Sequence, residues 1–237
     1  MSFFKEAITV ALDTVVPSHC FACSKLLSDG KIICADCFKG LELLPQNVCN
    51  SCGNAKNCCE CKDNVYHFAG LCAPFFNKGA AQQGIYSLKF SNKPMLSDFY
   101  GEFMAETVLK RFDDIQFDFV CAVPMKPWNK LVKDYNHAEL LGKVVAEKLN
   151  LTFEKGVLAR KFFAKIQHKV KGVNNRYKNA YKNYTYKRKI SGKVLLVDDI
   201  KTTGASLDAC ARALLYAGAD EVYCVTALLT DKTVEKR

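Results

Sequence analysis

The sequence predicts an α/β fold, in which helices flank a parallel sheet, with a small zinc-binding domain in front of it. Three observations lead to this prediction. Apolar strand-like segments alternate with amphipathic helices through most of the chain, which is typical of parallel sheets with right-handed crossovers. Four Cys-x-x-Cys pairs lie close together near the N-terminus. One apolar strand ends in two aspartates and a hydroxyl-rich turn.

Length and composition favour a folded protein with two domains. A chain of 237 residues, 49% of them hydrophobic, suits one α/β domain of moderate size and a small accessory domain. We expect an amphipathic helix over residues 1–17, a cysteine-rich domain over 18–65 and the larger domain over 66–237. No apolar run approaches the ~20 residues needed to cross a bilayer, and no signal-peptide cleavage site follows the N-terminus. These features predict a cytoplasmic protein without a transmembrane segment.

The cysteines predict metal binding. Thirteen cysteines in a chain expected in the cytoplasm indicate metal sites rather than disulfides. Two Cys-x-x-Cys pairs supply the four thiolates of a structural zinc site, so four pairs predict two zinc ions. The expected ligands are Cys20, Cys23, Cys34 and Cys37 for one ion, and Cys49, Cys52, Cys58 and Cys61 for the other. We prefer this sequential pairing to a cross-braced one because its loops are shorter, and Cys59 is an alternative to Cys58.

The other cysteines and the elements of the larger domain follow from hydrophobic patterns. Cys72, Cys121, Cys210 and Cys224 lie in apolar settings and are expected to be buried. The expected strands and helices alternate along the chain. They are a strand-rich segment over 80–90, a helix over 95–111, a strand over 117–123, a helix over 136–149, an apolar piece over 156–159, a strand over 194–197, a helix over 206–217 and a strand over 221–229.

The segment 194–206 carries the chemistry of a sugar-phosphate site. Asp198 and Asp199 follow a buried strand, at the sheet edge where ligands of parallel sheets bind. Their carboxylates can accept strong hydrogen bonds from a ribose diol. The following turn leads into a helix N-terminus, which offers unpaired N–H groups and a positive dipole end to a phosphate. The hydroxyl and glycine residues of this turn are Thr202, Thr203, Gly204 and Ser206.

The same segment resembles the phosphoribosyl-pyrophosphate (PRPP) motif of the type I phosphoribosyltransferases. The resemblance implies that the acidic pair holds the ribose hydroxyls, that the loop wraps the 5′-phosphate, and that Mg²⁺ accompanies PRPP. The residues implied in PRPP binding are Asp198, Asp199, Lys201, Thr202, Thr203, Gly204, Ala205, Ser206 and, for the pyrophosphate, Lys126. Because the family usually has an apolar or aromatic residue at position 201, we expect the Lys201 side chain either to add charge beside the phosphate or to point to solvent.

Further motifs, in an order that covers nearly the whole chain, resemble the ComF/GntX family. They are the cysteine-rich N-terminus, Leu88-Lys89-Phe90, Val123-Pro124, the segment 133–141, and the series Arg160, Gln167, Arg176 and Asn179. The resemblance implies a phosphoribosyltransferase fold behind a zinc-binding domain. It also implies a role in natural competence, in which imported single-stranded DNA is handled on the cytoplasmic side together with other DNA-uptake proteins.

Departures from the family pattern concern the pyrophosphate and lid regions. The family has arginine, glycine and glutamine where this chain has Lys133, Asp134 and His137, and threonine where it has Ala164. These changes weigh against efficient transfer more than against PRPP binding. Whether the chain is an enzyme, and on which acceptor, therefore stays open.

A long basic segment also bears on function. Residues 155–197 contain thirteen of the 34 lysines and arginines of the chain and none of its 24 acidic residues. Interleaved aromatic side chains would suit single-stranded nucleic acid, which stacks on them while cations neutralise its backbone. A lid over PRPP or a solvated loop are the alternatives. The candidate nucleic-acid contacts are Lys169, Lys171, Arg176 and Lys178.

The leading hypothesis is therefore a PRPP-binding, phosphoribosyltransferase-like protein of DNA uptake. One alternative is a metabolic phosphoribosyltransferase that acts on a small base. The other is a nucleic-acid-binding zinc module whose transferase site is a relic.

Overall fold

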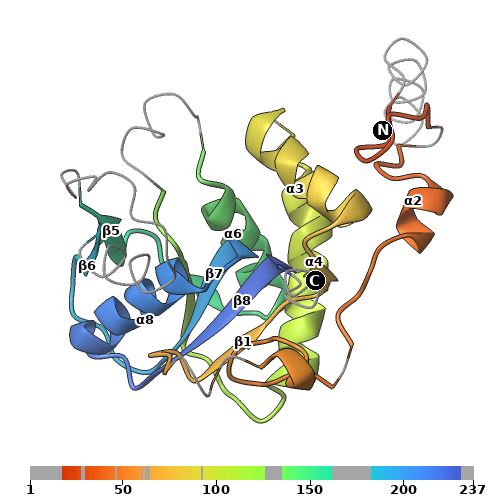
Figure 1. Ribbon diagram of the computed structural model, residues 1–237. Coiled ribbons are helices and arrows are strands. Elements are labelled where there is room, and N and C mark those ends of the chain that lie inside the picture. Colours follow the sequence, from red (N-terminus) through yellow and green to blue (C-terminus); the bar gives the residue numbers. More distant parts are fainter. Residues whose placement is uncertain are drawn as a thin grey trace, which may run out of the picture.

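The computed structural model describes residues 18–27, 30–45, 47–59, 61, 65–91, 93–125, 135–161 and 183–230. Within them a six-stranded parallel sheet has the strand order β1-β8-β7-β3-β4, and β2 pairs with β8. Helices cover both faces of this sheet (Figure 1), so the predicted α/β class is confirmed. The expected helix over 1–17 lies outside the described residues.

The two longest strands form the middle of the sheet. They are β7 (Lys193–Lys201) and β8 (Glu221–Leu229), which pair in parallel along their whole length. The apolar run 194–197 of β7 is fully buried, as its sequence predicts. On one side of this pair lie β3 (Phe119–Ala122) and β4 (Thr152–Phe153), and on the other β1 (Gly70–Cys72) and β2 (Phe75–Phe76).

Each face of the sheet has its own apolar core. One core is formed with α8 (Ala205–Ala217), and the other with α3 (Gly79–Phe90), α4 (Leu96–Arg111) and α6 (His137–Lys148). Figure 1 shows α8 on the opposite side of β7 and β8 from α4 and α6. A two-stranded antiparallel sheet of β5 (Leu158–Arg160) and β6 (Tyr184–Tyr186) packs against α8. All four cysteines expected to be buried in the larger domain are less than 3% exposed.

Two expectations for secondary structure are wrong. The segment 80–90 is the helix α3, because Ala81, Ile85 and Leu88 are buried at helical spacing. A Cβ on Gly84 would clash with the Tyr100 hydroxyl, so this glycine serves the close packing of α3 on α4 and does not break a strand. The strand expected over 194–197 continues through the acidic pair to Lys201.

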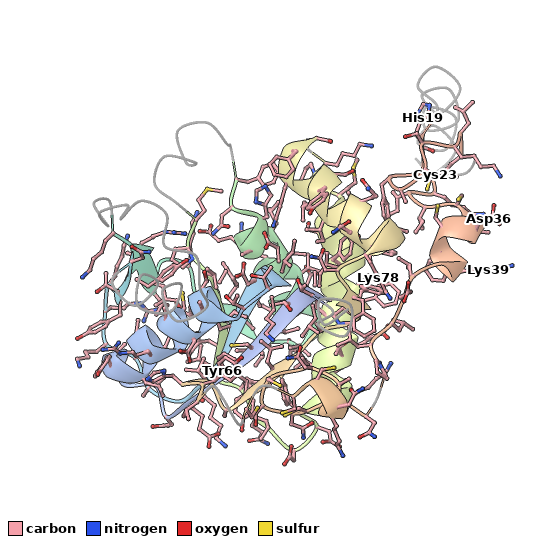
Figure 2. All side chains as sticks on the ribbon, in the orientation of Figure 1. His19, Cys23, Asp36, Lys39, Tyr66 and Lys78 are labelled. Atoms are coloured by element: carbon pink, nitrogen blue, oxygen red, sulfur yellow. The ribbon has the colours of Figure 1, made fainter. Side chains whose placement is uncertain are left out.

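The cysteine-rich region contains little regular structure. Among its described residues the helical elements are α2 (Ala35–Lys39) and a 3-10 turn, η1 (Lys56–Cys58). Figure 2 shows Cys23 and Asp36 in a small lobe beside α2, apart from the centre of the sheet. None of the helices in the described ranges is long and apolar enough to span a membrane.

Candidate functional site

The first cysteine cluster brings together the four ligands that its spacing predicts. The sulfurs of Cys20, Cys23, Cys34 and Cys37 lie within 4.8 Å of one another. Backbone N–H groups point at them, as when Cys34 N–H donates to the sulfur of Cys20 over 3.4 Å. Burial disfavours the Cys20 thiolate, but donation from the backbone N–H groups of Cys34, Cys23 and Ala22 outweighs it and lowers its pKa to about 6.

The second cluster corrects one expected ligand. It consists of Cys49, Cys52, Cys59 and Cys61, so Cys59 stands in the place expected for Cys58. Cys58 ends the 3-10 turn η1, whereas Cys59 follows it in an extended conformation. The consecutive Cys-Cys pair allows either sulfur to serve, and the backbone at the end of η1 decides between them.

Both clusters have the dimensions of a zinc site. Zn–S bonds of about 2.3 Å in a tetrahedron require sulfurs about 3.8 Å apart. The Cys23–Cys34, Cys49–Cys61 and Cys52–Cys59 sulfur pairs are separated by 3.7, 3.6 and 3.8 Å. Each cluster draws on consecutive parts of the chain, an arrangement that agrees with sequential pairing. Four thiolates would close the coordination shell of a zinc ion bound there, as in structural rather than catalytic zinc sites.

At the carboxyl end of the sheet, an acidic pair meets a lysine from another element. Asp198 and Asp199 extend from β7, and the Asp199 N–H donates to the Asp198 carboxylate over 2.9 Å. Lys89, in the last turn of α3, contacts the Asp199 carboxylate with 2.9 Å between Nζ and Oδ2. The Lys89 and Asp199 side chains are only 20% and 17% exposed. The site therefore contains a largely buried ion pair that the sequence analysis does not anticipate.

The surroundings of the acidic pair disfavour its full ionisation. Burial and the neighbouring charge of Asp199 raise the pKa of Asp198 to about 8, although Lys89 and Arg160 oppose this shift. Near neutral pH the pair therefore keeps a proton. A ligand that supplies hydroxyl donors or a cation would favour the fully ionised pair and release that proton.

The loop after β7 forms a left-handed turn that leads into α8. Gly204 precedes the helix with φ of +81°, a conformation that favours glycine. The Thr203 hydroxyl accepts from the Ala205 N–H over 3.4 Å. Thr202 is exposed, and the first turn of the thirteen-residue helix α8 begins at the loop. Backbone N–H groups and hydroxyls are thus gathered beside the acidic pair, as the sequence predicts.

Arg160 and Tyr184 flank this loop from the β5–β6 sheet. The Arg160 guanidinium donates to the Tyr184 hydroxyl over 3.1 Å and lies over its ring. Burial raises the pKa of Tyr184 to about 12, while Arg160 and the Ser206 side chain oppose the shift. Tyr184 thus connects Arg160 to the loop, and Arg160 supplies a cation near Asp198.

Lys201 does not have the side-chain position expected from its place in the motif. Its side chain is 1% exposed, so the expectation that it points to solvent is wrong. Its Nζ lies 3.4 Å from Oδ1 of Asn54, which follows Cys52 of the second cysteine cluster by two residues. A residue of the candidate phosphate loop is therefore engaged with the cysteine-rich region.

Several candidate residues lie outside the described residues. These are Lys126 at the expected pyrophosphate position, and Lys169, Lys171, Arg176 and Lys178 of the basic segment. In the described ends of that segment, Lys155 pairs with Glu139, Arg188 with Glu154 and Lys193 with Glu221. These three cations have structural partners.

A cavity of about 380 Å³ lies beside Arg160. Its lining includes apolar residues of β3 and β5 and charged residues of both signs. The polar and charged lining residues are Glu139, Glu154, Lys155, Arg160 and Lys187.

Sequence reasoning missed the roles of Lys89 and Tyr184. Lys89 belongs to the Leu88-Lys89-Phe90 motif, which the sequence analysis uses only as a family marker. Nothing in the local sequence shows that the end of α3 meets the end of β7, because 110 residues separate Lys89 from Asp199. Tyr184 lies in a tyrosine-rich segment whose individual members look alike.

Comparison with known proteins gives one informative match. The chain is 25% identical over 212 residues to the competence protein ComFC of Streptococcus pneumoniae, covering 83% of this chain and 87% of that protein. No family model matches the chain. The match to ComFC, together with the motif order, supports a ComFC-like family assignment.

Proposed function

We propose that the chain binds PRPP at the carboxyl end of β7 and acts in natural competence. The observation that carries the proposal is the acidic pair with its loop and helix N-terminus, flanked by cations from two other elements. This arrangement offers acceptors for a ribose diol on one side and donors for a phosphate on the other.

In this proposal each part of PRPP has its own partners. Asp198 and Asp199 accept hydrogen bonds from the ribose hydroxyls. The loop residues 202–206 donate to the 5′-phosphate through backbone N–H groups and hydroxyls. Lys89 and Arg160 add positive charge near the acidic pair. Carboxylate oxygens are suitable ligands for Mg²⁺, which would accompany the pyrophosphate.

The competence role rests on the similarity to ComFC of Streptococcus pneumoniae. We extend it to the handling of single-stranded DNA because aromatic and basic side chains alternate in the segment 155–197. A nucleic-acid partner would neutralise the excess positive charge of that segment.

Thermal unfolding of the zinc-loaded protein tests PRPP binding. PRPP and Mg²⁺ at 100 times the dissociation constant should stabilise the protein by about 2.7 kcal/mol. For a chain of this size that energy raises Tm by about 5–10 °C. The Asp198→Asn/Asp199→Asn variant should remain folded and show no ligand-dependent rise. An equal rise in both proteins would place the ligand elsewhere.

A separate titration tests the nucleic-acid role. Charge reversal at Lys169, Lys171 and Lys178 should weaken binding of a single-stranded oligonucleotide and lower its salt dependence. Reversal of Lys110, an exposed lysine on α4, is the matched control and should change neither. Unchanged affinity of the triple variant would remove this segment from the DNA path.

The cavity beside Arg160 favours a second candidate, transfer of the phosphoribosyl group to an acceptor. Its volume admits a group the size of a nucleobase. Release of pyrophosphate from PRPP, measured with candidate bases, tests this activity. Rapid release with one base would favour a metabolic enzyme. No thermal shift and no release from the zinc-loaded protein would favour a relic site in a nucleic-acid-binding zinc module.

A further inference from the structure

We propose that the second cysteine cluster positions the candidate phosphate loop through the contact between Asn54 and Lys201. This inference rests on the proposed function, because it concerns the same loop, but it assigns the cysteine-rich region a part in ligand binding. Lys201 would be a positioning residue that acts through its buried ammonium group rather than on the ligand.

The position of Lys201 makes this contact consequential. It is the last residue of β7, it pairs with Leu229 of β8, and Thr202 follows it as the first residue of the loop. Its side chain is almost completely buried, and its Nζ lies 3.4 Å from Oδ1 of Asn54. A buried ammonium group is unfavourable unless it has polar partners, and the Asn54 side chain is one of these partners.

Asn54 is held by the metal-binding turn itself. It follows Cys52 by two residues, and its carbonyl accepts from the Cys49 N–H over 2.8 Å. Asn54 is 2% exposed. The adjacent Gly53 has φ of +75°, and a Cβ there would clash with Leu71 and Leu229. The turn between Cys49 and Asn54 is therefore packed directly against β1 and the end of β8.

The negative charge of a zinc site with four thiolates would also favour the contact between Lys201 and Asn54. A zinc ion with four thiolates carries a formal charge of −2, which stabilises a nearby buried cation. Regular structure within 49–59 and 61 is limited to the 3-10 turn η1 and the bridge at Ala55, so a bound metal ion would add to the constraint that packing and backbone hydrogen bonds place on this segment. Loss of zinc from this cluster would loosen the turn that carries Asn54 and weaken its contact with Lys201.

The first cluster lacks a corresponding contact among the described residues. It meets the larger domain through Phe21, which packs on Phe99 and Tyr100 of α4. The two clusters are therefore expected to differ. The second should affect the loop 202–206, and the first should affect mainly its own lobe.

Hydrogen–deuterium exchange in the full-length, zinc-loaded protein without ligand tests the coupling. Lys201→Met and Asn54→Ala should each increase exchange at 202–206 at least threefold, and the double variant should add little to either. Lys193→Met is the matched control, because Lys193 begins the same strand and pairs with Glu221 at the surface. It should leave exchange of the loop unchanged. Zinc content should stay at two ions per chain in the three single variants.

A second measurement relates the coupling to the ligand. PRPP affinity should fall about tenfold in Lys201→Met and Asn54→Ala, and should stay within twofold of wild type in Lys193→Met. If the wild type binds no PRPP, the exchange data still decide the coupling, and the proposed function alone fails. Unchanged loop exchange in both Lys201→Met and Asn54→Ala would overturn the coupling, whatever the wild type binds.

Discussion

Replacement of Lys89 by methionine tests the electrostatics of the acidic pair without any ligand. At an effective dielectric constant of about 20, unit charges 2.9 Å apart interact by about 6 kcal/mol before desolvation. Removal of Lys89 also recovers the desolvation energy of its ammonium group, and the Lys89–Asp199 ion pair is about one-fifth exposed. The net loss of stability is therefore smaller than this interaction energy. We expect Lys89→Met to lower the free energy of unfolding by about 2–3 kcal/mol at pH 8.5.

The loss should depend on pH in a defined direction. The pKa of Asp198 is raised in the folded protein, so the stability from its protonated form is complete below about 3.8 and is lost as pH rises through about 8. Lys89 opposes this rise in pKa, and its removal makes the ionised pair still less favourable. Lys89→Met should therefore cost less at pH 5.5, where Asp198 is protonated and the substitution removes only the ion pair of Lys89 with Asp199.

Urea denaturation at the two pH values measures both effects. Lys78→Met is the matched control, because it removes a more exposed lysine from the start of the same helix, where its partner is Glu42. That exposed pair should contribute at most about 1 kcal/mol, with little change between pH 5.5 and 8.5. An equal loss at both pH values for Lys89→Met, or one no larger than for Lys78→Met, would refute the reasoning.

Three further predictions concern the acidic pair, the metal ligands and the core. Asp198→Asn should raise the free energy of unfolding by about 1–3 kcal/mol at pH 8.5 and by less at pH 5, and a loss at pH 8.5 in denaturant titrations would contradict the raised pKa. Cys59→Ser should reduce zinc content from two ions per chain to one, whereas Cys58→Ser should keep two; elemental analysis giving the reverse would show that Cys58 is the ligand. Gly84→Ala should destabilise the protein by about 1–3 kcal/mol in urea, because the new Cβ meets Tyr100, and a neutral effect would show that α3 can shift.

The central strands could be predicted because their signals are local. Four buried apolar residues before two aspartates define β7, and the final strand is read from its apolar pattern with the same bounds as in the structure. The helix α3 could not be read in this way. Its segment contains Ile85 and Tyr86, which suit a strand, and Gly84, which disfavours a helix; only the close packing on Tyr100 explains this glycine within a helix.

The same limit applies to the candidate site. Asp198, Asp199 and the loop are consecutive, so the sequence predicts them as a group. Lys89, Tyr184 and Asn54 come from distant segments that only the fold brings to this loop. Cys59 rather than Cys58 belongs to the second cluster for a local reason, the end of the 3-10 turn η1. The spacing of the cysteines does not show in which direction a sulfur points after such a turn.

Calorimetric titration of PRPP and Mg²⁺ into the zinc-loaded protein tests the central claim most directly. Performed at pH 7 in two buffers of different ionisation enthalpy, it should give one site per chain and the release of up to one proton, because binding ionises the pair that contains Asp198. The Asp198→Asn/Asp199→Asn variant should give no heat of binding. Absence of binding to the wild type, or equal binding to both proteins, would contradict a PRPP site at the end of β7.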